Sequence, residues 1–153
     1  MRITEYMNIE WICLNITEND KKNAIRQLFN KIEESKNLEK NGKKILDAVY
    51  AREELMSTGV GSGIALPHAK TDLCPEFFIG LGISPSGIDY EAIDNNKVKI
   101  ICLLIGPEKE PNKHIKFLSK ISKILNQENI RKELINAKNR EDVFNIFLEN
   151  ELK

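Results

Sequence analysis

The sequence predicts an α/β fold in which a mixed β-sheet is sandwiched between helices. Two apolar runs of strand length, Phe77 to Ile83 and Val98 to Ile105, lie among stretches whose apolar residues recur at helical spacing. The second run, VKIICLLI, is typical of a strand buried on both faces. Such a strand needs layers above and below it, and the helical stretches supply them. With 153 residues, 41% of them hydrophobic, the chain has the size of one compact domain, residues 1–153.

A strand and a helix are predicted first. From Trp11 to Ile16 apolar and polar residues alternate, which indicates a short half-buried strand. A helix is predicted over Lys21 to Ser35, because Asn19 or Asp20 can cap it and its apolar residues form one stripe. That stripe contains Ala24, Ile25, Leu28, Phe29 and Ile32.

Four more helices are predicted from the same spacing. One runs from Lys43 through Arg52 and fades near Ser57 and Thr58, ahead of a group of glycines. Another spans Asn112 to Leu125. Two short helices follow, marked first by Ile130 and Leu134 and then by Val143, Ile146 and Phe147.

The charge balance excludes several classes of partner. Lys plus Arg and Asp plus Glu both number 23, so the formal net charge is zero and no broad positive field exists to attract nucleic acid or an anionic membrane. No stretch approaches the roughly 20 apolar residues needed to cross a bilayer, and the first residues lack an export signal. We therefore expect a cytoplasmic protein that binds no nucleic acid and is not inserted into a membrane.

The cysteines indicate reduced thiols. Cys13, Cys74 and Cys102 are odd in number, far apart and without a Cys-x-x-Cys pair, and Cys102 lies inside the apolar run. Carboxylate and cysteine spacings typical of zinc sites are also missing. We expect structural cysteines, no metal and no cofactor.

The most unusual stretch is Ser57 to Asp72, STGVGSGIALPHAKTD. Three glycines at alternate positions lead into a brief apolar strand that ends in Pro67-His68. Pro67 fixes its own φ and favours an extended Leu66, so His68 is predicted to stand on a stiff backbone at the edge of the sheet. The glycines tolerate positive φ and can bring backbone N–H groups close to an anion. No Gly-Lys-Ser/Thr follows them, so a nucleotide-binding loop is not predicted.

These residues resemble a known family. The segment REELMSTGVGSGIALPHAK resembles the phosphorylation-site signature of the type 2 enzyme IIA domains, the fructose, mannitol and nitrogen-regulatory class of the bacterial phosphotransferase system. IDYEAIDNNKVKIICLLIGP and HIKFLSKISKIL are similar to later parts of the same domains. The resemblance implies a mixed sheet of about five strands between helices.

The resemblance also implies an active site. His68 corresponds to the histidine that accepts a phosphoryl group, Arg52 to an arginine sixteen residues earlier, and His114 to a second histidine forty-six residues later. Phosphoryl transfer requires mainly positioning and charge stabilisation, which a neutral imidazole and an arginine fork can provide. Ser57, Thr58 and the N–H of Gly63 are candidate phosphate ligands, although serine and threonine are also common at helix ends and turns without any ligand role.

Each candidate also has a plain structural interpretation. A lone histidine after a proline is often incidental, and Arg52 is one charge among Arg52, Glu53 and Glu54 on an exposed helix end. Aromatic residues in apolar runs, here Phe77, Phe78 and Phe117, belong more often to a core than to a docking surface. The combined spacing of His68, Arg52 and His114 favours the functional interpretation for all three.

Three functions remain open. The first is a phosphocarrier, a phosphotransferase component that takes a phosphoryl group onto His68 from the histidine-containing phosphocarrier protein and passes it to an enzyme IIB component for fructose-class or mannitol-class sugar uptake. The second is a nitrogen-regulatory phosphoprotein that controls partner proteins. The segment AIDNNKV resembles the regulatory branch of the family and slightly favours this role. The third, remote alternative is a metal-binding or hydrolytic domain that uses His68 and His114. Ala69-Lys70 stands where relatives often have glycine, which leaves the pathway undecided.

Overall fold

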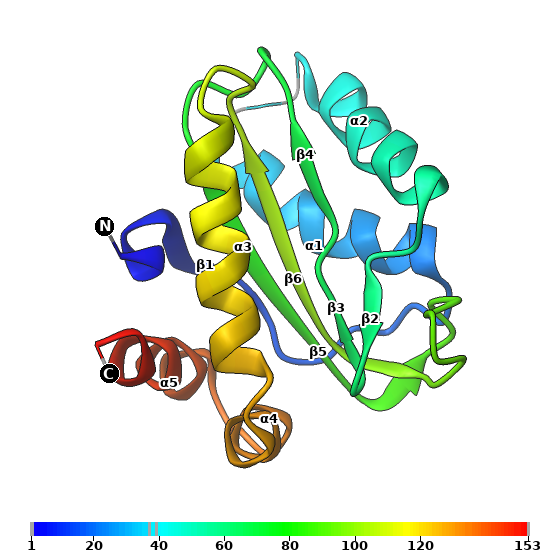
Figure 1. Ribbon diagram of the computed structural model, residues 1–153, viewed down its shortest axis with the longest axis vertical. Helices are drawn as coiled ribbons and strands as arrows, with labels where there is room; N and C mark the ends of the chain where they lie inside the picture. The colour runs from blue at the N-terminus through cyan, green and yellow to red at the C-terminus, as the bar shows by residue number, and fades with distance from the viewer. Residues whose placement is uncertain (1, 37, 39, 153) are drawn as a thin grey trace.

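The computed structural model describes residues 2–36, 38 and 40–152, so Met1 and Lys153, the ends of the expected domain, lie outside it. In these residues a six-stranded sheet has helices on both faces (Figure 1). The strands are β1 (Met7–Cys13), β2 (Gly59–Gly61), β3 (Ile64–Ala65), β4 (His68–Lys70), β5 (Phe78–Ile88) and β6 (Val98–Gly106). The predicted α/β sandwich is confirmed.

Two helices cover one face of the sheet and three cover the other. Beneath α1 (Lys21–Lys36) and α2 (Gly42–Leu55) lies one hydrophobic core, and beneath α3 (Pro111–Leu125), α4 (Glu128–Ile135) and α5 (Arg140–Glu151) lies a second (Figure 1). A short 3-10 helix, Ile3–Tyr6, precedes β1. All five predicted helices are therefore present, and their bounds differ from the predicted ones by a few residues.

Strand β6 lies inside the sheet and contributes to both cores. It pairs antiparallel with β5 on one side and parallel with β3 and β4 on the other, while β1 pairs parallel with β5. Ile101, Leu103 and Ile105 point into the core under α1 and α2, and Ile100, Cys102 and Leu104 point into the opposite core. This alternation explains why the sequence of the strand has no polar face.

Strands β3 and β4 are two halves of one interrupted strand. Ala65 is opposite Ile101 and His68 is opposite Leu104, so the pairing with β6 keeps the same register across the break. The break falls at Leu66 and Pro67, where the proline has no N–H to donate, and its carbonyl still accepts from the Leu104 N–H at 3.0 Å. His68 thus begins the second half, whose only strand neighbour among the described strands is β6.

The glycine segment contains more structure than predicted. Where the sequence predicts one brief strand, the chain forms three, so the sheet has six strands, whereas the sequence patterns predict four and the resemblance implies about five. Strands β2 and β3 form a hairpin whose two turn residues, Ser62 and Gly63, have φ of 59° and 76°. Positive φ at both positions is what a tight type I′ hairpin turn requires. Of the three glycines, Gly63 therefore serves first to reverse the direction of the chain.

The first strand is shifted from its predicted place. The alternation from Trp11 to Ile16 predicts a strand there, but β1 runs from Met7 to Cys13. Ile16 is buried outside the strand, with its N–H bonded to the Ile83 carbonyl at 2.9 Å. The helix prediction that follows is confirmed, since the Asp20 carboxylate accepts from the Asn23 N–H at the start of α1.

Candidate active site

His68 is half-buried at the start of β4, on the face of the sheet that carries α3. Its neighbour Ala69 belongs to the core under α1 and α2, so the alternation of the strand places His68 and Lys70 on the opposite face. The Nδ1 nitrogen lies 2.7 Å from the Leu66 carbonyl oxygen. Because a carbonyl only accepts, Nδ1 carries the proton, and a neutral ring then has its lone pair on Nε2. The ring is fixed in the tautomer that a nucleophilic Nε2 needs.

Burial keeps this ring neutral. It lowers the pKa of His68 below its usual value of 6.5, and the positive charges of Arg52 and Lys70 lower the pKa further. The Leu66 carbonyl and the Glu53 carboxylate act in the opposite direction. The net effect favours the uncharged, nucleophilic form at neutral pH.

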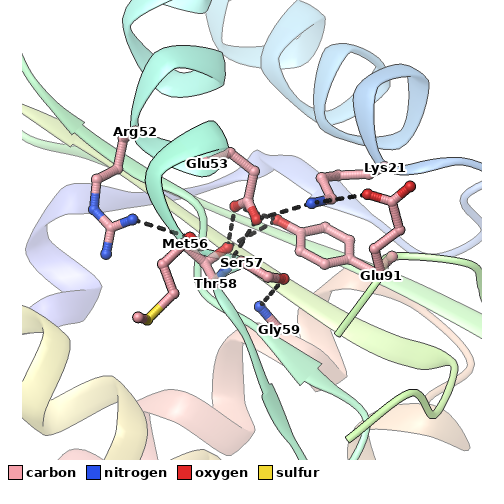
Figure 2. A network of polar contacts seen from close by, with 9 residues as sticks. Lys21, Arg52, Glu53, Met56, Ser57, Thr58, Gly59 and Glu91 are labelled. Atoms are coloured by element: carbon pink, nitrogen blue, oxygen red, sulfur yellow. Dashed lines mark hydrogen bonds and ion pairs between the residues drawn. The ribbon is translucent and has the colours of Figure 1, made fainter. Parts of the chain in front are cut away.

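Arg52 lies in the last turn of α2, and α2 packs beside β4, the strand of His68 (Figure 1). The side chain is half-buried, and its Nη1 donates to the Met56 carbonyl oxygen at 3.1 Å (Figure 2). That bond uses one of the five N–H groups of a guanidinium, so donors remain for a phosphoryl oxygen. The structure brings Arg52 and His68 to the same edge of the sheet.

His114 lies in the first turn of α3 and is fully buried against the edge of the Phe77 ring, with the centroids 4.8 Å apart. Within the described part of the chain, neither ring nitrogen makes a hydrogen bond of standard geometry. Burial lowers the pKa of His114, and the Gly106 and Pro107 carbonyls act in the opposite direction. Lys70 and His68 also act to lower the pKa of His114.

The three candidate phosphate ligands lie in different surroundings. Ser57 is half-buried, and its hydroxyl accepts from the Gly59 N–H at 3.1 Å. Thr58 is 4% exposed, and its hydroxyl is already engaged by Glu53 and Tyr90. Gly63 precedes β3, at the opposite end of the interrupted strand from His68: Ile64 is opposite Ile100 of β6, whereas His68 is opposite Leu104. The structure does not bring Gly63 to the histidine.

One site residue was missed by sequence reasoning. Glu53, treated above as one charge among several, is only 5% exposed and accepts hydrogen bonds from Thr58 and Tyr90 while pairing with Lys21 (Figure 2). A signal for it exists in the sequence. Glu53 lies four residues after Val49 and eight after Ile45, so it belongs to the buried stripe of α2.

A hollow of about 520 Å³ opens beside this network rather than beside His68. Glu53 and Ser57 contribute to its wall, whereas His68, Arg52 and His114 do not. The remaining lining residues are Asp20, Lys21, Lys22, Tyr50, Glu54, Asp89 and Glu91. His68 itself is half-buried and does not line this hollow.

The aromatic residues and cysteines considered in the sequence analysis have structural rather than catalytic positions. Phe77, Phe78 and Phe117 are buried, as expected of core residues. Burial raises the pKa of the Cys74 and Cys102 thiols to about 12, so neither is an activated nucleophile.

No three His, Cys, Asp or Glu side chains converge as metal ligands in residues 2–36, 38 and 40–152. Over the same residues, no helix has the length and apolar character of a bilayer span.

Comparison with known proteins identifies the family. The model of the phosphoenolpyruvate-dependent sugar phosphotransferase system EIIA 2 family matches residues 5–150. The fructose-specific EIIABC component of Bacillus subtilis is 34% identical over 146 residues, which cover 95% of this chain but 23% of that protein. The fructose-specific EIIA component of Haloferax volcanii is 35% identical over 104 residues, covering 68% of each chain.

A solved structure supports the same assignment. The crystal structure of nitrogen regulatory protein IIA-Ntr from Neisseria meningitidis superimposes with a TM-score of 0.87 at 26% identity, covering 95% of this chain and 98% of that one. The expected resemblance is thus confirmed in both sequence and fold, and this chain belongs to the EIIA 2 family of the phosphoenolpyruvate-dependent sugar phosphotransferase system.

Proposed function

We propose that this chain is a phosphocarrier domain, spanning residues 1–153, that accepts a phosphoryl group on Nε2 of His68. The observation that carries the proposal is the 2.7 Å contact between Nδ1 of His68 and the Leu66 carbonyl, which leaves the Nε2 lone pair free on a half-buried ring. A neutral imidazole with one fixed tautomer is a competent nucleophile at neutral pH.

The transfer step is a direct exchange of one N–P bond for another. The Nε2 lone pair attacks the phosphorus of a phosphohistidine on the donor, the donor N–P bond breaks, and its electron pair stays on the donor nitrogen. As the lone pair of Nε2 is used, positive charge develops on the ring, and the Leu66 carbonyl stabilises it through Nδ1–H. No proton has to leave His68 during the step.

The neighbouring charges suit the transferred group. The phosphoryl oxygens carry negative charge in the transition state, and Arg52 offers a planar fork that can bind two of them. Lys70 adds a second positive charge on the same face as His68. His114 is neutral and fully buried, and its ring nitrogens make no hydrogen bond of standard geometry among the described residues, so its assignment rests on its spacing from His68. We assign Arg52 and His114 to stabilisation of the phosphoryl group, and Ser57 as a further donor.

Membership of the family supports a proposal for the phosphoryl donor and acceptor. We propose that the histidine-containing phosphocarrier protein supplies the phosphoryl group in the cytoplasm and that an enzyme IIB component of the fructose or mannitol class removes it. The similarity to two fructose-specific relatives supports this assignment. The Bacillus relative carries components A, B and C in its name, and this chain spans less than a quarter of its length.

Phosphorylation in a reconstituted system tests the proposal. Wild-type protein incubated with phosphoenolpyruvate, enzyme I and the phosphocarrier protein is expected to acquire one acid-labile, base-stable phosphate. His68→Ala is expected to acquire none, while Cys74→Ala, a control at a buried thiol, is labelled like wild type. Absence of label on wild type, or full label on His68→Ala, contradicts the proposal.

A regulatory role is the second candidate, supported by the similarity to the Neisseria IIA-Ntr structure. The two roles differ in where the phosphate goes. For a transport component, adding a fructose-class enzyme IIB removes the label from the phosphorylated protein within seconds. For a regulatory phosphoprotein, the label stays, and the phosphorylated and unphosphorylated forms differ in affinity for a partner protein.

A further inference from the structure

Glu53 is a buried carboxylate directly next to Arg52. It lies in the last turn of α2 and is 5% exposed, although most charged side chains remain in water. Removing a carboxylate from water is costly unless its oxygens are hydrogen-bonded or paired. The placement therefore requires several partners, and these partners connect Glu53 to the rest of the site.

The partners come from three other parts of the chain. The Thr58 N–H donates to Oε2 at 2.8 Å, and the Thr58 hydroxyl donates to Oε1. The Tyr90 hydroxyl, fully buried just after β5, donates to Oε1 at 3.0 Å. Lys21, the first residue of α1, places its Nζ 3.3 Å from Oε2. Together these four contacts occupy the acceptor capacity of one carboxylate.

The contacts with Thr58 fix the segment that holds Arg52. Because Glu53 binds both the N–H and the hydroxyl of Thr58, the chain from 53 to 58 forms a closed loop (Figure 2). Met56 lies inside this loop, and its carbonyl accepts from the Arg52 guanidinium. The position of the guanidinium therefore depends on the loop that Glu53 closes.

The same loop leads to His68 through the backbone. The Thr58 carbonyl accepts from the Leu66 N–H at 3.0 Å, and the Leu66 carbonyl accepts from Nδ1 of His68 at 2.7 Å. A continuous run of hydrogen bonds thus joins Glu53, Thr58, Leu66 and His68. The loop attaches to the guanidinium on one side and to the acceptor imidazole on the other.

From this arrangement we infer that Glu53 is a positioning residue for phosphoryl transfer. It fixes the position of the Arg52 guanidinium relative to the His68 imidazole. The inference rests on the proposed function of His68. Glu53 does not touch the phosphoryl group in this scheme, because its oxygens are engaged by Thr58, Tyr90 and Lys21. Its effect on transfer is therefore expected to require Arg52.

A double-mutant cycle tests this dependence. Single-turnover transfer from the phosphorylated phosphocarrier protein is measured at pH 7.5 for wild type, Glu53→Gln, Arg52→Ala and the double variant. In Glu53→Gln the amide NH2 cannot accept from Thr58 or Tyr90, and the rate is expected to fall at least tenfold. In the Arg52→Ala background the same change is expected to cost less than threefold. Equal losses in the two backgrounds overturn the inference.

Two controls separate positioning from charge and from stability. Glu54→Gln removes the same charge from the exposed neighbour of Glu53 and is expected to leave the rate within twofold of wild type. Val143→Ala, in the core under α5, lowers the melting temperature without slowing transfer. If Val143→Ala slows transfer as much as Glu53→Gln at matched stability, the effect is general destabilisation and the inference fails.

A milder variant covers the case in which Glu53→Gln does not fold. Tyr90→Phe removes a single donor from the carboxylate, and a twofold to fivefold loss is expected that also disappears in the Arg52→Ala background. An equal loss in both backgrounds overturns the inference here too. Failure of the proposed function is distinct, since wild type itself then takes no phosphate onto His68.

Discussion

Nδ1 of His68 lies 2.7 Å from the carbonyl oxygen of Leu66, two residues earlier in the same interrupted strand. Pro67 stands between them and fixes the backbone that holds donor and acceptor together. The hydrogen bond is therefore a local property of the Leu-Pro-His segment. It determines which ring nitrogen is free, and the pH behaviour of the site follows from the surroundings of that ring.

His68 is expected to titrate below pH 6.5. Burial and the charge of Arg52 both lower its pKa, so the neutral ring predominates down to lower pH than in a free histidine. The rate of phosphoryl acceptance should therefore stay near its maximum from pH 8 to 7 and fall to half only at a pH below 6.5. An imidazole NMR titration of wild-type protein measures the midpoint directly, and a midpoint above 6.5 contradicts this account.

Replacing Arg52 with Lys is expected to slow transfer about 10- to 100-fold. Lysine keeps the charge but loses the planar fork, and one charge-assisted hydrogen bond is worth ~1.5–3 kcal/mol. The fold should remain intact because Arg52 is only half-buried. Single-turnover kinetics measure the effect, with Arg140→Lys on the exposed end of α5 as the control. Unchanged kinetics in Arg52→Lys would remove Arg52 from the site.

Gly63→Ala is expected to reduce stability without slowing transfer. The φ of 76° costs an L-residue ~1–2 kcal/mol, and the position lies far along the strand from His68. Urea unfolding measures the loss, and Ser62→Gly, which relieves the positive φ of the neighbouring turn residue, should be at least as stable as wild type. A large loss of transfer rate in Gly63→Ala would contradict this prediction and indicate that Gly63 binds the phosphoryl group.

His114 is expected to make the protein less stable in mild acid. Its folded pKa is lowered by burial, so the unfolded chain binds a proton near pH 6.5 while the folded chain does not. The free energy of unfolding should therefore fall as the pH drops through 6.5. Urea unfolding at pH 7.5 and 5.5 should show a smaller fall in His114→Gln than in wild type. A fall of equal size in both proteins would exclude a lowered pKa at His114.

The helices and the two long strands were predictable because local pattern and burial agree there. The apolar residues of α1 and β6 face the hydrophobic cores, and the spacing of apolar residues in a sequence indicates such buried surfaces directly. Strand β1 was misplaced because Ile16 is buried without belonging to a strand. Strand β5 extends through Pro85 and Gly87, which normally end strands, because a register shift between Ile83 and Ile88 accommodates them.

The site was predictable to the extent that its residues lie in one local motif. The resemblance gave His68, Arg52 and His114. In the structure α2, which carries Arg52, packs beside the strand of His68, and His114 is buried in the first turn of α3. Tyr90, thirty-seven residues after Glu53, meets it only through the tertiary fold, so no local spacing predicts that contact. The hydrogen bond of His68 with Leu66 likewise depends on backbone geometry that residue types alone do not specify.

The nitrogen atom that carries phosphorus tests the central claim most directly. Long-range 1H–15N NMR spectra of the phosphorylated protein report the state of both ring nitrogens of His68 and of His114. We predict phosphorus on Nε2 of His68, with Nδ1 still protonated and bonded to Leu66 and with His114 unmodified. Phosphorus on Nδ1 of His68, or on any residue other than His68, would contradict the account.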